Sequence, residues 1–127
     1  MSTTPNYATT PRFGRAAISA AEASRTAPTA VVAAVTAVAA GTVLERAIVQ
    51  ATGTTTAGMV RLFIHDGTSY SLLKEIEIEA RVPSATLKAF AVELDLDGIS
   101  LPSGHSIRAA THNAEAFVVS VFAADLT

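Results

Sequence analysis

The segment LLKEIEIEARV, residues 72–82, decides the fold class of this chain. Within it, Ile76 and Ile78 alternate with glutamates. Successive side chains of a β-strand point to opposite faces, so a period of two directs the isoleucines to a core and the glutamates to water. The segment therefore predicts a half-buried strand with a solvated glutamate face.

The segment before it repeats the alternation. In GMVRLFIHDG, residues 58–67, every second residue from Val60 is aliphatic and is expected to face the core, whereas Arg61, Phe63 and His65 point outward. The Asp-Gly pair at its end is a turn signal. We expect a strand whose outer face is only partly polar.

Three further strands are expected downstream. LKAFAVELDLDG, residues 87–98, alternates in the same way and is expected to end in a turn at Asp97 and Gly98. HSIRAAT, residues 105–111, and AFVVSVFAADL, residues 116–126, complete this part of the chain. Their inward positions carry Ile, Ala, Phe and Val, a composition that suits a buried strand face.

The upstream half is richer in alanine. TVLERAIVQAT, residues 42–52, and TAVVAAVTAV, residues 29–38, are expected to be strands, because their β-branched residues favour extended backbone. Residues 16–23 stay open between strand and helix, because alanine is the best helix former. Pro28 would end such a helix.

Seven or eight short strands separated by turn residues, with no convincing interior helix, predict an all-β fold. The expected architecture is an antiparallel β-sandwich that is jelly-roll-like. We expect a single β-sandwich domain over residues 14–127. Residues 1–13, rich in Pro and Thr, are expected to form an extended N-terminal arm that can dock on a neighbouring subunit.

Composition narrows the function classes. The 127 residues contain no cysteine, which excludes disulfides and thiolate chemistry. The net charge is -2 and no basic cluster is present, so we expect no nucleic-acid partner. The longest uncharged run of apolar character, residues 27–41, is rich in Ala and Thr and is shorter than the roughly 20 apolar residues that cross a bilayer, so we expect no membrane partner.

Candidate catalytic and metal-binding residues have simpler interpretations. His65 and Asp66 are adjacent and so point to opposite faces of a strand, which disfavours a base and carboxylate pair. His105 and His112 stand at no short ligand spacing from each other or from His65. The glutamates of residues 75–79 suit a solvated face better than a Ca²⁺ site. The sequence predicts no enzyme and no cofactor or metal, which argues against a hydrolase or isomerase of cupin-like shape.

Three segments together resemble small structural proteins encoded among the virion genes of tailed bacteriophages. They are ATGTTTAGMVRLFIHDG, residues 51–67, PSATLKAFAVELDL, residues 83–96, and ISLPSGHSIRAATHNAEAFVVSVFA, residues 99–123. The resemblance spans about residues 14–125. Among these virion proteins, capsid decoration or cement proteins are the most similar in size and all-β character.

The resemblance implies a non-enzymatic protein that binds the outer surface of the capsid and stabilises the head lattice. Its partners would be the major capsid protein and copies of itself, as a homotrimer or a homodimer. It would be made in the host bacterial cytoplasm and would reside on the capsid exterior of the virion. Such proteins have no catalytic residue to carry over.

The alternative is another virion component, such as a tail, collar or fibre-tip β-sandwich module that contacts the host or neighbouring subunits. Its mark would be an aromatic platform for glycans, and tyrosine is scarce in this chain. The expected subunit interface is the face bearing Phe63, together with the small-residue strand in residues 31–38. The candidate oligomer or capsid contacts are Phe13, Arg15, Arg61, Phe63 and Tyr70.

Overall fold

The computed structural model describes residues 8–126, and it describes side-chain burial for residues 10–126. The described part of the chain consists of eight strands joined by turns and loops, with no helix. The strands are β1 (Ala8–Ile18), β2 (Val32–Thr36), β3 (Thr42–Ala51), β4 (Gly58–His65), β5 (Tyr70–Ile78), β6 (Ala91–Leu101), β7 (Ser106–Thr111) and β8 (Phe117–Leu126).

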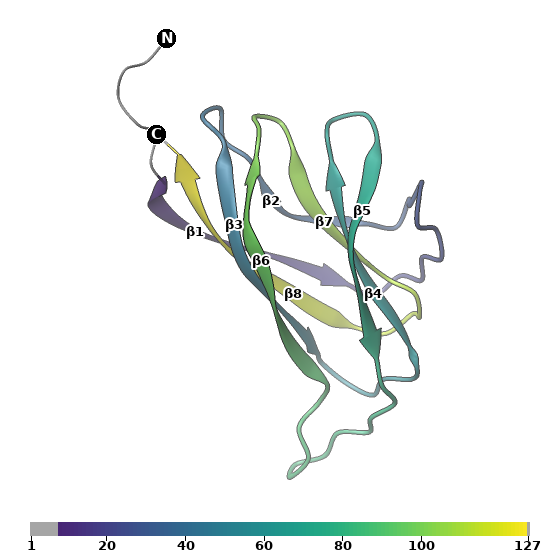
Figure 1. The fold of residues 1–127 in the computed structure, drawn as a ribbon. Coiled ribbons are helices and arrows are strands. Elements are labelled where there is room, and N and C mark those ends of the chain that lie inside the picture. Colours follow the sequence, from purple (N-terminus) through teal and green to yellow (C-terminus); the bar gives the residue numbers. More distant parts are fainter. Residues whose placement is uncertain (1–7, 127) are drawn as a thin grey trace.

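The strands form two four-stranded sheets that pack face to face (Figure 1). The first sheet has the order β1-β8-β3-β6 and the second sheet has the order β2-β7-β4-β5. All the pairings within them are antiparallel. This order, in which consecutive strands mostly alternate between the sheets, is that of a jelly roll. The predicted all-β sandwich is therefore confirmed.

One hydrophobic cluster fills the space between the sheets and draws on every strand. The alternation in the sequence identified much of it, because β5, β6, β7 and β8 bury the side that their pattern predicted. Its fully buried members include Leu44, Val49, Val60, Leu62, Leu96, Ile107, Val119 and Val121.

The predicted N-terminal arm is wrong for residues 8–13. These residues belong to β1, in which Pro11 pairs with Ala124 and Phe13 pairs with Phe122 of β8. β1 is an edge strand, and an edge strand tolerates proline because one side of its backbone makes no ladder hydrogen bonds. Residues 1–7 of the predicted arm lie outside the described residues.

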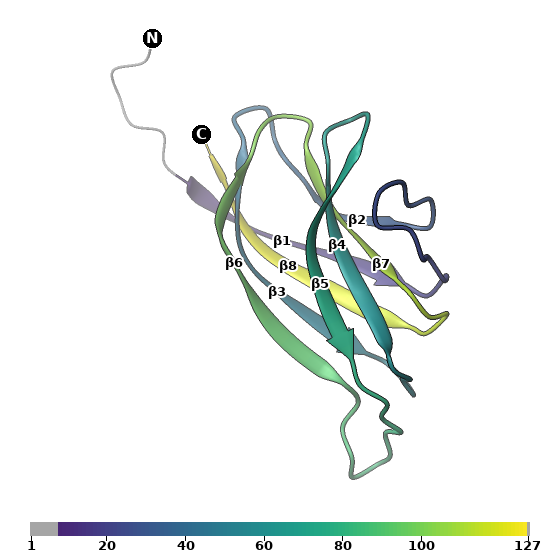
Figure 2. The ribbon, with the colours of Figure 1, turned by 45° about the vertical axis from the view of Figure 1, so that its right-hand side comes forward.

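The open question over residues 16–23 is resolved as a strand end followed by a loop. β1 continues to Ile18, and residues 19–31 then form a loop that lies beside β2 and β7 (Figure 2). The backbone N–H of Glu22 donates to the carbonyl oxygen of Thr111 in β7, at 2.8 Å. The alanine-rich segment thus forms no helix, because its polar backbone finds partners in a neighbouring strand.

The predicted turn at Asp97 and Gly98 does not end its strand. Both residues have positive φ, 57° and 69°, yet β6 continues through them to Leu101. The pairing with β3 shifts here, so that Glu45 alone lies opposite the three residues between Asp95 and Ile99. The Asp-Gly pair therefore forms a β-bulge, which requires the same left-handed backbone as a tight turn.

Candidate functional site

The loop of residues 19–31 is held together from within by the carboxylate of Glu22, whereas the backbone of Glu22 binds Thr111 and Arg61 of the second sheet. One oxygen, Oε1, accepts the backbone N–H groups of Thr29 and Ala30, both at 2.8 Å, and Oε2 accepts that of Ser24 at 3.1 Å. These backbone hydrogen bonds, with Ala30 the largest contributor, lower the pKa of Glu22 to about 2. The ionised carboxylate organises the loop from within.

Beneath this loop, two arginines share one carboxylate. Oε2 of Glu75 accepts from Nε of Arg25 at 2.7 Å and from Nε of Arg61 at 2.9 Å. The side chain of Arg61 is only 4% exposed, whereas that of Arg25 is 53% exposed. The hydrogen bond from Arg25, followed by that from Arg61, lowers the pKa of Glu75. Glu75 is therefore an ion-pair partner on the exposed glutamate face that the sequence predicted.

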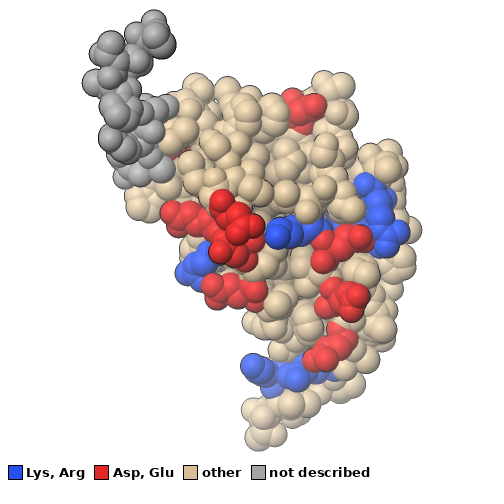
Figure 3. Space-filling model, in the orientation of Figure 1, with Lys and Arg blue, Asp and Glu red and all other residues tan. Residues whose placement is uncertain are grey.

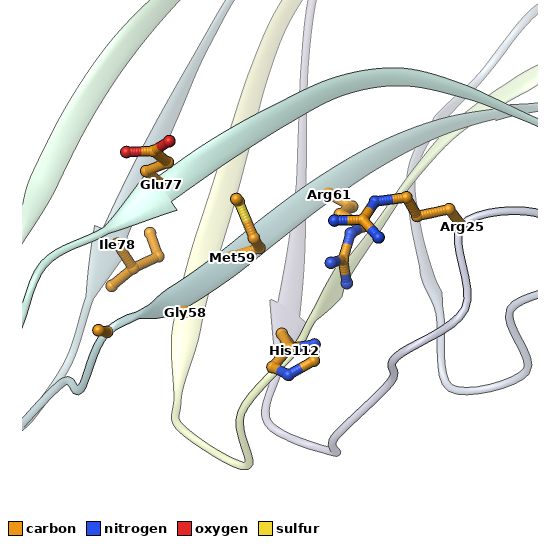
Figure 4. A pocket seen from close by; sticks show the side chains of 8 residues that line it. Arg25, Gly58, Met59, Arg61, Glu77, Ile78 and His112 are labelled. Atoms are coloured by element: carbon orange, nitrogen blue, oxygen red, sulfur yellow. The ribbon is translucent and has the colours of Figure 1, made fainter.

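A shallow pocket of about 420 Å³ opens beside this cluster, between the loop and the ends of β4 and β5 (Figure 4). The two guanidinium groups lie at one end of it and Glu77 lies at the other. Met59 and His112 also line it. Both guanidinium groups already bind Glu75, and Arg61 also donates to the carbonyl oxygen of Glu22, so these two side chains hold the loop in place.

The histidines and carboxylates gather no metal site among the described residues. Asp66 accepts the backbone N–H groups of Thr68 and Ser69, both at 2.8 Å, and these hydrogen bonds lower its pKa to about 2. His65 instead packs its ring 4.3 Å from that of Tyr70. The two residues therefore have separate structural roles at the turn between β4 and β5.

Two of the five predicted contact residues are buried, which corrects the sequence interpretation. Arg61 is 3% exposed and Phe63 is fully buried, so neither can form a contact surface. Both lie on the outer face of the second sheet. The loop of residues 19–31 covers Arg61, whose Nη1 donates to the carbonyl oxygen of Glu22. The ring of Phe63 packs edge-on against that of Tyr70, with the ring centroids 6.0 Å apart. The interface predicted around Phe63 is therefore unavailable.

The remaining predicted contacts are at least partly accessible and lie on different sheets. Phe13 is 53% exposed and Arg15 is exposed, both on the outer face of the first sheet. Tyr70 is half-buried on the second sheet, where its hydroxyl accepts from Nη1 of Arg108 at 3.0 Å. The structure therefore brings Phe13 and Arg15 together but separates them from Tyr70.

Exposed apolar side chains that the sequence pattern missed lie on the connection between β5 and β6. Val82 is 69% exposed and Leu87 is 47% exposed, in a loop that projects beyond one end of the sandwich (Figure 1). The signal available in the sequence was that these two apolar residues flank PSAT, residues 83–86, a segment typical of turns. Alternation alone assigns such residues to strand ends, so it gives no reason to place them at a tip.

No family model matches the sequence, and none of the curated proteins matches it. The described residues also contain no helix with the length and apolar character needed to cross a membrane.

Proposed function

We propose that this chain is a non-enzymatic structural protein of a bacteriophage particle, which binds the outer surface of the capsid and stabilises the head lattice. The resemblance of residues 51–67, 83–96 and 99–123 to small virion proteins supports this role. The jelly roll is compatible with it, since viral capsid domains use this architecture. The fold alone is weak support, because one fold hosts many functions.

The observation that carries the proposal is the projecting loop of residues 79–90, which presents apolar side chains on an ordered backbone. Ser84 closes its tip, because its Oγ accepts the backbone N–H groups of Thr86 and Leu87 at 3.3 and 3.1 Å. At its base, Arg81 and Thr55 exchange two backbone hydrogen bonds at 3.0 and 2.9 Å. These hydrogen bonds fix the backbone on which Val82 and Leu87 stand, and both side chains are exposed to solvent.

Such a tip is suited to insertion between surface features of another protein. A loop ordered before binding loses little conformational entropy when it docks, and burial of two aliphatic side chains supplies an apolar driving force. One such contact is modest, but a capsid repeats it at many equivalent positions, so linked copies bind with added avidity. A decoration protein needs this kind of contact and needs no catalytic pocket.

The second candidate, a tail, collar or fibre-tip module that contacts host glycans, has less support from the side chains. Tyr70 is the only tyrosine among the described residues. Its ring packs against His65 and Phe63, and its hydroxyl already binds Arg108. An aromatic platform for sugars requires an open ring face, which this arrangement limits.

Binding to capsids tests the proposal directly. Purified protein is mixed with capsids of the encoding phage that lack it, and the mixture is sedimented and imaged by electron microscopy. We expect co-sedimentation and regular density on the capsid exterior. Absence of binding, or density on the tail alone, would overturn the decoration role.

Variants of the loop tip test the contact itself. We expect the double substitution Val82→Ser and Leu87→Ser to lower capsid affinity by about tenfold or more, because two apolar anchors are removed. Ala85→Ser, in the same loop, is the matched control and is expected to bind normally. Equal binding by all three proteins would contradict the assignment of this loop as the capsid contact.

A further inference from the structure

Two phenylalanine side chains pack against each other on the solvent-facing side of the first sheet. Phe13 of β1 and Phe122 of β8 are register partners, and their rings meet edge to face with centroids 5.1 Å apart. The guanidinium of Arg46 in β3 lies 4.0 Å from the centroid of the Phe122 ring. Phe13 remains 53% exposed, which is unusual for a phenylalanine on a strand.

The next row of the same face has opposite charges at its two ends. Arg15 of β1 pairs with Ser120 of β8, Ser120 pairs with Ile48 of β3, and Ile48 pairs with Glu93 of β6. Arg15 and Glu93 are exposed, whereas the two central residues are half-buried. The row thus reads cation, small polar group, aliphatic group and anion from one edge of the sheet to the other.

Acidic groups reinforce the β6 side. Asp95 of β6 is exposed beside Glu93, and Glu45 of β3 lies close to both. Figure 3 shows acidic side chains gathered on this side of the molecule. Arg46 offsets part of this charge through its ion pair with Glu93 at 3.3 Å. The β1 side is therefore basic at Arg15, and the β6 side is acidic.

This distribution is complementary to itself under one particular symmetry. A two-fold axis that runs parallel to the strands, in the plane between two such faces, places β1 of one copy over β6 of the other. Arg15 of each copy then faces the acidic side of the other copy. In the middle, β8 of each copy lies over β3 of the other, which brings Phe122 over Arg46 and Ser120 over Ile48. A two-fold axis across the strands would instead place β1 over β1 and β6 over β6, so that like charges face each other.

We propose that two copies of this chain associate through the outer faces of their first sheets, about a two-fold axis parallel to the strands. Isologous interfaces of this kind are the commonest in homo-oligomers. Four strands at about 4.8 Å spacing, each contributing about eight residues, give a footprint of roughly 500 Å² per copy. This lies near the lower end for stable interfaces, so we expect a weak dimer, with a dissociation constant on the order of micromolar.

The inference goes beyond the proposed function and does not rest on it. The dimer face lies on the first sheet, whereas the capsid contact was assigned to the loop of residues 79–90. The outer face of the second sheet is a poorer interface, because the loop of residues 19–31 occupies part of it. Association in solution can therefore be measured without any capsid.

Sedimentation equilibrium of the full chain from about 1 to 200 µM tests the dimer, because this range brackets a micromolar dissociation constant. We expect the mass to rise from 13.0 kDa towards twice that value. Phe13→Ser is expected to weaken association by about tenfold or more, since it removes the large exposed aromatic side chain that β1 contributes to this face. Leu72→Ser, which removes an exposed apolar side chain from the second sheet, is the control and is expected to leave association unchanged.

Charge reversal tests the axis. Arg15→Glu and Glu93→Lys are each expected to weaken the dimer, and the double variant is expected to regain affinity relative to either single one, because the opposite charges still face each other. A mass of 13.0 kDa throughout the range, a trimer mass, or no effect of Phe13→Ser would overturn the dimer. A double variant weaker than both single ones would overturn the axis parallel to the strands.

Discussion

Gly14 of β1 lies so close to Ala34 of β2 that a Cβ atom added to the glycine would overlap with the carbonyl oxygen of Ala34. The two residues belong to different sheets, so this contact sets how closely the edges of the sheets approach. The γ-methyl group of Val35 lies 2.6 Å from the same position, which closes a second direction. Glycine is thus required here by space.

The first prediction is that Gly14→Ala destabilises the fold by about 1 to 3 kcal/mol, because the β1 and β2 backbones must move apart. Urea unfolding measures the loss. Gly53→Ala is the matched control, since nothing lies within 4 Å of its added methyl group and its backbone conformation is ordinary. Equal stability of the two variants would show that the sheets separate without cost.

The second prediction concerns the unequal roles of Arg25 and Arg61. Glu75→Ala leaves Arg61, whose side chain is 4% exposed, without its carboxylate. An uncompensated buried charge costs about 3 to 5 kcal/mol, so we expect a large fall in the urea midpoint. Arg25→Gln removes an exposed partner and is expected to cost less than about 1 kcal/mol.

The double variant Arg61→Met with Glu75→Met completes this comparison. It removes both charges and keeps apolar volume, so we expect it to be more stable than Glu75→Ala alone. A double variant that is as unstable as the single one would mean that the carboxylate supports the loop mainly through Arg25. Heat or urea unfolding of the four proteins distinguishes these outcomes.

The third prediction follows from Glu22, whose pKa falls from 4.5 to about 2. A lowered pKa in the folded state stabilises the fold fully above the ordinary value of the unfolded chain, and this contribution disappears as the pH falls through about 2. The wild type should therefore lose stability relative to Glu22→Gln between about pH 4.5 and pH 2.

Urea midpoints of both proteins at pH 6, 4, 3 and 2 check this dependence. Subtraction of the Glu22→Gln curve is needed because Asp66, with its pKa also at about 2, contributes in the same range. The protection factors of the Thr29 and Ala30 amides in hydrogen exchange, taken relative to the intrinsic rate at each pH, should fall in parallel, since their acceptor is the titrating group. A difference between the proteins that does not change with pH would contradict the role of this carboxylate.

The sequence predicted the strands well where one face is buried and the other is in water. β5 and β8 follow this rule, so their period of two identified both the element and its core side. β4 does not follow it, because Arg61 and Phe63 are covered although they point away from the core. The residues that cover Arg61 and Phe63 come from other segments of the chain. A local sequence pattern does not show which segment will pack over a given strand.

The same limit explains the other errors. The pairing of Pro11 and Phe13 with β8 depends on residues at the far end of the chain, so composition alone favoured an arm. The bulge at Asp97 and Gly98 uses the backbone of a turn, and only the length of the neighbouring strand shows that the chain continues. Strand order likewise follows from long-range pairing. The ion-pair cluster had one local signal, namely Arg61 within an apolar run, which requires a buried acceptor.

The final prediction compares the stability cost of truncating a buried and an exposed side chain on neighbouring strands of the second sheet. Phe63 is fully buried and Leu72, its register partner on β5, is 38% exposed. Phe63→Ala is expected to cost about 3 to 5 kcal/mol through lost burial and a residual cavity, whereas Leu72→Ala should cost much less. Urea unfolding of both variants measures the difference. If Phe63 were an exposed contact residue, as alternation in the sequence indicates, the two substitutions would have similarly small effects, and the covered arrangement of β4 would be contradicted.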